Sequence, residues 1–229
     1  MIAERVAAVR ERIARAAERA GRRGDEITLV AVSKTFPAES VLEAVAAGCL
    51  DLGENRVQEA EAKIAATAGL RGSGLRWHLI GHLQANKARK ALALFDCIHS
   101  VHELDLGQRL ARIAAEQGRV AHVFVEVDLA GEATKHGLPA DELPATLDAL
   151  RPLPSLSVDG LMLIPPLFDD PEQARPYFRR LRALRDACVA AGRLAAGQLS
   201  MGMSHDLEVA IEEGATLVRV GTAIFGGRG

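Results

Sequence analysis

The chain has 229 residues, of which 48% are hydrophobic and 25% are charged, with a formal net charge of −2. This composition predicts one well-packed domain over residues 1–229 and excludes a disordered chain. There is no basic excess and only 3% of the residues are aromatic, so we expect neither nucleic acid nor an anionic membrane as a partner.

Targeting signals and cysteine usage predict a cytoplasmic protein. The N-terminal segment is rich in arginine and glutamate and lacks the apolar run of a secretory signal. No apolar stretch approaches the ~18 residues of a transmembrane helix. The cysteines at positions 49, 97 and 188 form no disulfide or metal pattern, and free thiols are typical of the reducing cytoplasm.

In chain order, apolar periodicity first predicts an amphipathic helix over Ile2–Ala20. Strands and helices then alternate. The predicted strands are Thr28–Ser33, Leu50–Gly53, Arg76–Ile80, Cys97–Ser100, Ala121–Val127, Ser157–Leu163, Gln198–Ser200 and Leu217–Val220. The predicted helices between them are Pro37–Ala47, Arg56–Ala68, Gln84–Leu94, Glu103–Gln117, Ala140–Leu150, Pro171–Ala191 and His205–Glu213.

This alternation predicts an α/β fold, a single (β/α)8 TIM barrel with an extra N-terminal helix that covers the barrel or packs beside it. Several strands, such as residues 122–127 (HVFVEV), are runs without alternation, which indicates burial on both faces as in parallel sheets. The alternative is a doubly wound open sheet. No G-x-G-x-x-G follows an early strand, so a dinucleotide-binding fold loses its main support.

Functional groups of a barrel lie where its strands end and in the loops that follow. Lys34 directly follows the first buried strand, and the chain has only five lysines against 23 arginines. A lysine in surroundings of low dielectric is more readily neutral, and a neutral amine attacks an aldehyde. A solvated lysine at a strand end is the alternative interpretation. The residues at or just after the ends of the other predicted strands are Glu54, Asn55, His78, His82, Ser100, Asp128 and Met162.

The loops after the last two strands contain small residues close to helix starts, which predicts a phosphate site. Ser204 also fits the N-cap of the helix that follows it. A phosphate site opposite an aldehyde-capturing lysine predicts pyridoxal 5′-phosphate (PLP). The residues at this corner are Ser200, Gly202, Ser204, Gly221 and Thr222.

Arg219 lies within the apolar segment LVRVG (217–221) and needs a hydrogen-bond acceptor. One interpretation is a buried ion pair. The other is a hydrogen bond to the pyridine nitrogen of the cofactor, which a protonated arginine would keep unprotonated.

No metal site is expected. His78 with His82, and His99 with His102, have spacings seen in metal sites, but no carboxylate cluster joins them. His78 and His99 also lie on predicted strands, where these offsets do not reproduce a helix face.

Seven segments resemble the pyridoxal phosphate homeostasis proteins, also called the proline synthase co-transcribed homologue family. They are AVSKTFP (31–37), DLGENRVQE (51–59), WHLIGHLQANK (77–87), IHSV (98–101), GLMLIPP (160–166), LSMGMSHDLEVAI (199–211) and VRVGTAIFG (218–226). The resemblance covers nearly the whole chain. It implies the barrel of the alanine racemase N-terminal domain, standing alone, with PLP held covalently as a Schiff base.

By that resemblance Lys34 is the PLP lysine and Arg219 faces the pyridine nitrogen. The other implied cofactor-binding residues are Asn55, His78, Met162, Ser200, Met201, Gly202, Ser204, Gly221 and Thr222. His102 and His205 depart from the residues common in the family, which would change the mouth of the pocket.

Two functions follow from a PLP barrel: a non-catalytic carrier in PLP (vitamin B6) homeostasis, and a PLP enzyme such as an amino-acid racemase. Two-base racemisation needs a second acid/base group opposite Lys34, commonly a tyrosine from another domain. The chain ends nine residues after Val220, and its one tyrosine, Tyr177, lies in a predicted helix. We therefore expect a monomeric carrier without catalytic residues, with apo-PLP enzymes as possible recipients.

Overall fold

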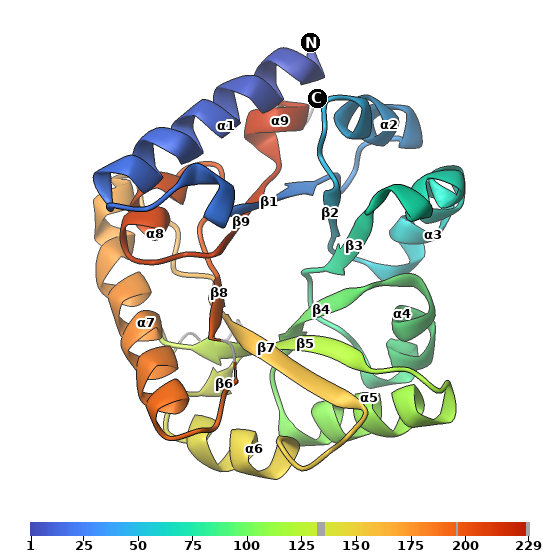
Figure 1. The fold of residues 1–229 in the computed structure, drawn as a ribbon, viewed down its shortest axis with the longest axis vertical. Coiled ribbons are helices and arrows are strands. Elements are labelled where there is room, and N and C mark those ends of the chain that lie inside the picture. Colours follow the sequence, from blue (N-terminus) through green and yellow to red (C-terminus); the bar gives the residue numbers. More distant parts are fainter. Residues whose placement is uncertain (132–135, 196, 228–229) are drawn as a thin grey trace.

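Eight parallel strands close into a barrel in the computed structural model, which describes residues 1–131, 136–195 and 197–227 (Figure 1). The barrel strands are β1 (Thr28–Val32), β2 (Asp51–Glu54), β3 (Arg76–Leu79), β4 (Cys97–Val101), β5 (Ala121–Asp128), β7 (Leu156–Met162), β8 (Gln198–Ser200) and β9 (Leu217–Val220). Their order is β4-β3-β2-β1-β9-β8-β7-β5, and β4 pairs with β5 to close the ring. The predicted TIM barrel is confirmed, and the open sheet is wrong.

Helices surround the barrel, and each of its strands is followed by one. They are α2 (Ala38–Ala46), α3 (Val57–Ala66), α4 (Ala88–Leu94), α5 (Leu104–Glu116), α6 (Leu143–Leu150), α7 (Arg175–Ala190), α8 (Leu207–Glu212) and α9 (Thr222–Phe225). Short 3₁₀ turns are η1 (Gly24–Glu26), η2 (Ala68–Ser73), η3 (Ala85–Lys87) and η4 (Pro171–Ala174). Within the described ranges, none of the helices is both long and apolar enough to cross a membrane.

Two short elements were not predicted from the sequence. The two-residue β6 (Leu138–Pro139) pairs in parallel with the end of β5. The four-residue α9 follows β9. Both are too short to show a hydrophobic period, which is the main signal for a helix or strand in a sequence.

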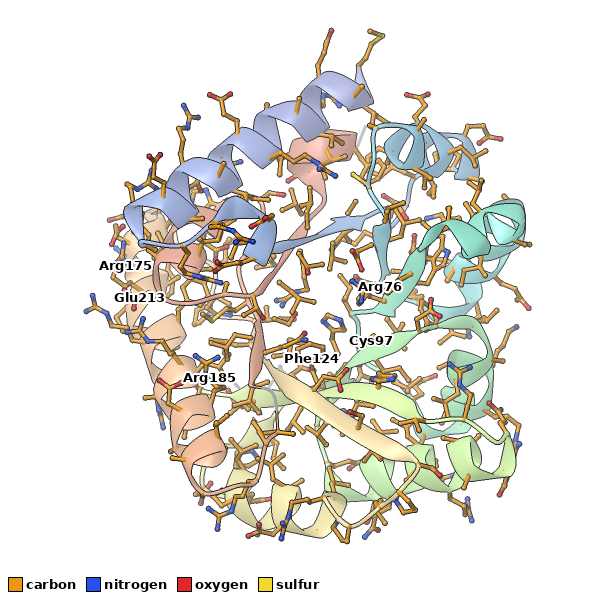
Figure 2. All side chains as sticks on the ribbon, in the orientation of Figure 1. Arg76, Cys97, Phe124, Arg175, Arg185 and Glu213 are labelled. Carbon is orange, nitrogen blue, oxygen red and sulfur yellow. The ribbon has the colours of Figure 1, made fainter. Side chains whose placement is uncertain are left out.

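The core has an inner and an outer part because successive residues of a strand face opposite sides. Inside the ring, Val30, Cys97, Phe124, Met162 and Leu217 form one buried cluster. Figure 2 shows Cys97 and Phe124 within the ring of strands. The larger outer cluster lies between the strands and the helices. The barrel is therefore packed through its centre, as in other TIM barrels.

The extra helix α1 (Ile2–Arg19) packs beside the barrel, against α8 and α9 (Figure 1). Its buried face carries Val6, Val9 and Ile13. Arg12 donates to both carboxylate oxygens of Glu208 at 2.6 and 2.8 Å, a bidentate geometry that fixes orientation. The helix thus supports the two elements that follow β8 and β9.

A charged network joins α7 to the end of α8 (Figure 2). Glu213 is only 3% exposed and accepts from Arg175 at 2.8 Å and from Arg179 at 3.0 Å. Arg175 also reaches Glu212 at 2.8 Å. Because the shared carboxylate is buried, this network holds α8 more firmly than isolated surface pairs would.

Candidate functional site

Lys34 lies at the carboxyl end of β1, where its side chain is half buried. Ser33 precedes it and is fixed on the outer side of the barrel, since its hydroxyl donates to Glu54 at 2.6 Å and its N–H donates to the Gly53 carbonyl at 3.0 Å. Strand alternation then directs Lys34 toward the barrel interior and mouth. Within the described residues, Lys34 has no hydrogen bond or ion pair, so its amine is available.

The turn after Lys34 is strained. Thr35 has a φ of 69°, in the left-handed region that a β-branched residue rarely adopts. The N–H of Phe36 donates to the Ser33 carbonyl at 3.0 Å, which closes a tight turn around Lys34. The rings of Phe36 and Phe225 stack at 5.3 Å, so this turn rests on α9. Strain of this kind is concentrated at functional sites.

Lys63 is a second buried lysine near this end of the barrel. It is 6% exposed, and its Nζ donates to Glu54 at 2.5 Å and to the Ser33 carbonyl at 2.7 Å. An ammonium held by two acceptors is a poor nucleophile. Lys63 therefore holds Ser33, the residue before Lys34, in place. Of these two lysines, Lys63 has a structural role and Lys34 has the available amine.

The predicted phosphate corner is built around the hydroxyl of Ser204. Its oxygen accepts from the backbone N–H groups of Gly221 and Ala223, each at 3.3 Å. Converging N–H groups of this kind bind anionic oxygens. Thr222, between them, begins α9 and is exposed. The sequence also suggested Ser204 as the N-cap of the helix that follows it. That prediction is wrong, because α8 begins at Leu207 and its N-cap is Asp206.

Gly202 gives this corner its shape. Its φ is 90°, and an added Cβ would lie 2.5 Å from the Cβ of Ala210. Its carbonyl accepts from the N–H of Arg219 at 2.9 Å, which ties the corner to β9. Both the backbone conformation and the close approach to α8 require glycine.

The change Gly202→Ala is expected to lower the free energy of unfolding by about 3 kcal/mol, from left-handed strain plus overpacking. Gly118→Ala is the matched control, because Gly118 has a φ of 64° but nothing within 4 Å of its Cβ position. That control should lose about 1 kcal/mol. Urea unfolding measures both, and equal losses would contradict a packing role for Gly202.

Arg219 is 4% exposed inside the barrel. It donates to the Ser200 hydroxyl at 2.7 Å and to the Leu163 carbonyl at 2.9 Å, and it has no ion pair among the described residues. Burial lowers the pKa of Arg219 to about 10, although Glu126 and Asp206 oppose this shift, so it remains charged at neutral pH. The buried ion pair, one of the two interpretations from the sequence, is therefore not formed among the described residues, and Arg219 donates to neutral acceptors instead.

The remaining predicted residues lie at the barrel mouth, inside the barrel or in the outer core. Asn55 lines a cavity of about 250 Å³ at the carboxyl ends of the strands, and Met162 lies in the inner cluster. Met201 is fully buried in the outer core, so its side chain faces away from the mouth. His78 lies deep in the barrel and lines a cavity at the amino-terminal ends of the strands. Their roles toward a cofactor stay predictions.

Sequence reasoning missed two groups that only the fold brings together. Glu126 is 7% exposed, lines the mouth cavity, and has a pKa raised by burial to about 7. His82, His102 and His136 lie together at the mouth. The rings of His82 and His136 stack with centroids 3.8 Å apart, and the ring of His102 is tilted by 44° against that of His82 at 4.6 Å. Burial and the two neighbouring histidines lower the pKa of His82. The spacings His78 to His82 and His99 to His102 thus bring no pair together. His78 instead contacts His99, and His82 contacts His102.

Comparison with known proteins shows the family of the chain. The family described as "Alanine racemase, N-terminal domain" matches residues 5–229. The pyridoxal phosphate homeostasis proteins of Aquifex aeolicus and Pseudomonas aeruginosa are 44% and 45% identical, over 98% and 99% of this chain and 97% and 96% of theirs. The chain belongs to the pyridoxal phosphate homeostasis protein family.

A solved structure shares this fold. PipY of Synechococcus elongatus, in a structure with PLP bound, superposes with a TM-score of 0.85 at 41% identity and covers 99% of this chain and 100% of that chain. The family resemblance stated from the motifs is therefore confirmed over nearly the full length. The two proteins share the barrel fold.

Proposed function

We propose that this protein binds PLP as a Schiff base on Lys34 and takes part in PLP homeostasis as a carrier, within one cofactor-binding barrel over residues 1–229. The observation that supports this most is the available amine of Lys34 at the barrel mouth, on a turn packed against α9. The Ser204 corner that would take the phosphate lies at the amino-terminal end of the same helix. When bound, PLP supplies an aldehyde that reacts with amines.

The residues around this site fit that cofactor. Ser204 marks a place where two backbone N–H groups already surround an oxygen, and phosphate oxygens are suited to the same donors. Arg219 uses two of its five N–H hydrogens on Ser200 and Leu163, which leaves donors for the pyridine nitrogen. A nitrogen facing arginine stays unprotonated, so the ring withdraws electrons weakly. This favours holding the cofactor over turnover.

A PLP-dependent racemase is the alternative function, and the described residues offer it little support. Racemisation by two bases requires a second acid/base group across from Lys34. Tyr177 lies on the outer helix α7, where its ring contacts Phe168 at 5.9 Å. The relatives named for PLP homeostasis also match over nearly their whole length. We infer a carrier without turnover, with apo-PLP enzymes as recipients.

The cysteines bear on the compartment of the protein. Cys49, Cys97 and Cys188 are free and buried, which is in keeping with a reducing cytoplasm. We infer a monomer as the working state.

The experiment that tests the proposal is chemical trapping. Incubation with PLP should produce the absorbance band of a Schiff base, and borohydride should then fix the cofactor to Lys34, as mapped by mass spectrometry of peptides. Lys34→Arg should lose the label. Lys90→Arg should retain it, because Lys90 is exposed and pairs only with Glu61 on the surface. A label on Lys63 or on any other lysine would overturn the assignment.

Turnover is tested separately. L-alanine incubated with the PLP-loaded protein should racemise no faster than with free PLP. Racemisation that depends on Lys34 would establish the alternative function.

A further inference from the structure

A line of five polar side chains runs through the barrel, from the amino-terminal ends of the strands to Arg219. The consecutive distances are 2.9 Å from Asp51 Oδ1 to His78 Nε2, 2.9 Å from His78 Nδ1 to His99 Nε2, and 2.9 Å from His99 Nδ1 to Ser200 Oγ. The last link is the 2.7 Å bond from Arg219 to Ser200 Oγ. His99 and Ser200 are fully buried, so water does not compete for these bonds.

The two ends of this line determine the direction of every hydrogen bond. Arg219 only donates, so the Ser200 oxygen accepts from it. The buried Ser200 hydroxyl has His99 Nδ1 as its one other hydrogen-bonding partner among the described residues, so its own hydrogen points there. At the other end, the Asp51 carboxylate, paired with Arg76 at 2.8 Å, accepts from His78 Nε2–H.

The middle link follows from the neutral ring of His99. Burial, His78 and Arg219 lower the pKa of His99 well below its ordinary value, so His99 is neutral. His99 then carries its single proton on Nε2 and donates to His78 Nδ1. Both ends give the same assignment, and no buried donor or acceptor of the line is left unpaired.

We propose that His78 and His99 are positioning residues: through Ser200, this line fixes the guanidinium of Arg219 in the orientation that faces the pyridine nitrogen. The proposal rests on the proposed PLP function for its last step, but the direction of the line does not. Other groups face Arg219 as well, namely Glu126 from β5 and Asp206 from the loop before α8. Neither forms a hydrogen bond with it in the described structure, so orientation comes from Ser200 and the Leu163 carbonyl.

The same residues suggest a competing interpretation, a metal site. The ligand atoms of His78, Cys97 and His99 lie within 4.8 Å of one another. Both ring nitrogens of His78 and of His99 take part in the line, so a metal ion bound by either ring would replace at least one of its hydrogen bonds. The two interpretations therefore exclude each other. The hydrogen-bonded line satisfies these nitrogens without an ion.

The first test needs no cofactor. Two-dimensional ¹H–¹⁵N spectra of the histidine-labelled apoprotein report which ring nitrogen carries the proton, with assignment by single histidine variants. Both His78 and His99 should be protonated on Nε2. Protonation of either ring on Nδ1 would overturn the proposal. So would stoichiometric Zn²⁺ binding to the wild-type apoprotein that is lost in His99→Gln.

The second test compares two substitutions at one position. The amide of His99→Gln can accept from Ser200 and donate to His78, so it preserves the line, whereas His99→Leu can do neither. Relative to the wild type, His99→Leu should raise the Kd for PLP about tenfold and shift the Schiff-base absorbance band, as expected for loss of one positioned charged hydrogen bond. His99→Gln should restore the band and bring the Kd within about twofold. Equal Kd values and bands for the two variants would overturn the proposal.

Asp51→Asn keeps the test decisive if His99→Leu does not fold. Asp51 lies at the barrel end opposite Lys34, and the amide oxygen of asparagine can still accept from His78 Nε2–H. Because Arg219 and Ser200 set the direction from the other end, both rings should remain protonated on Nε2, and the Kd for PLP should stay within about twofold of the wild type. A shift of either ring to Nδ1, or a roughly tenfold rise in the Kd, would contradict the proposed direction. If the wild type shows no Schiff base but both rings are protonated on Nε2, the cofactor proposal fails and the line stands.

Discussion

Replacing Lys63 with methionine is expected to lower the free energy of unfolding by about 3 to 5 kcal/mol, the cost of leaving a buried charge without its partner. Glu54 is fully buried, and its Oε2 already lacks a hydrogen-bond partner. Its Oε1 accepts from Lys63 at 2.5 Å and from the Ser33 hydroxyl at 2.6 Å. Without the ammonium, only the hydroxyl remains to solvate the carboxylate.

The double variant Glu54→Leu with Lys63→Met is the matched control. It removes both charges and leaves apolar side chains of similar volume, so it should recover most of the lost stability. Urea unfolding of the three proteins without cofactor gives the comparison. A single variant within about 1 kcal/mol of the wild type would mean that Glu54 does not depend on Lys63. Because Lys63 also holds the Ser33 carbonyl, the single variant should loosen the Lys34 turn as well.

Glu126→Gln is expected to stabilise the apoprotein at high pH and to have little effect at low pH. Burial raises the pKa of Glu126 from 4.5 to about 7, against the attraction of Arg219. Between these values the folded protein keeps a proton that the unfolded chain has released. Stability from this group is therefore present below pH 4.5 and is lost as pH rises toward 7.

The size and shape of this effect distinguish it from a general gain in stability. A shift of this size corresponds to about 3.4 kcal/mol, so Glu126→Gln should be more stable than the wild type by roughly that amount at about pH 8 and match it near pH 4.5. His82 and His99 act in the opposite direction. Their pKa values are lowered in the folded protein, so the free energy of unfolding decreases as pH falls below 6.5. Both proteins share these histidines, so the difference between them isolates Glu126. A difference that is constant with pH would contradict the prediction.

The barrel could be predicted because its signals are local. Most barrel strands contain a short apolar run, and the eight predicted strands agree with the structure to within a residue or two. Lys34 was found the same way, since a lysine that follows a buried strand must lie at the barrel mouth. The helices and strands that were not predicted, such as α9, are too short to show a hydrophobic period.

The interior polar groups could not be predicted because they depend on register between strands. His78 pairs in register with Cys97, which places His99 one side-chain step farther along β4 and within hydrogen-bonding distance. Nothing in the spacing of either histidine reveals this. Lys63 was missed for a related reason, because it lies in a polar helical segment whose buried partner, Glu54, belongs to the preceding strand.

The pairing of β1 with β9 has a consequence for how the chain matures. These strands come from near the two ends of the sequence, so their contact closes a very long loop and belongs to the slow, non-local part of folding. Lys34 follows one of them and Gly221 the other, each on its own side of this seam. A cofactor that bridges the seam would bind only after the barrel has closed, and its binding energy would then oppose reopening. Retention of PLP would thus serve as a readout of whether a newly made chain has completed its ring.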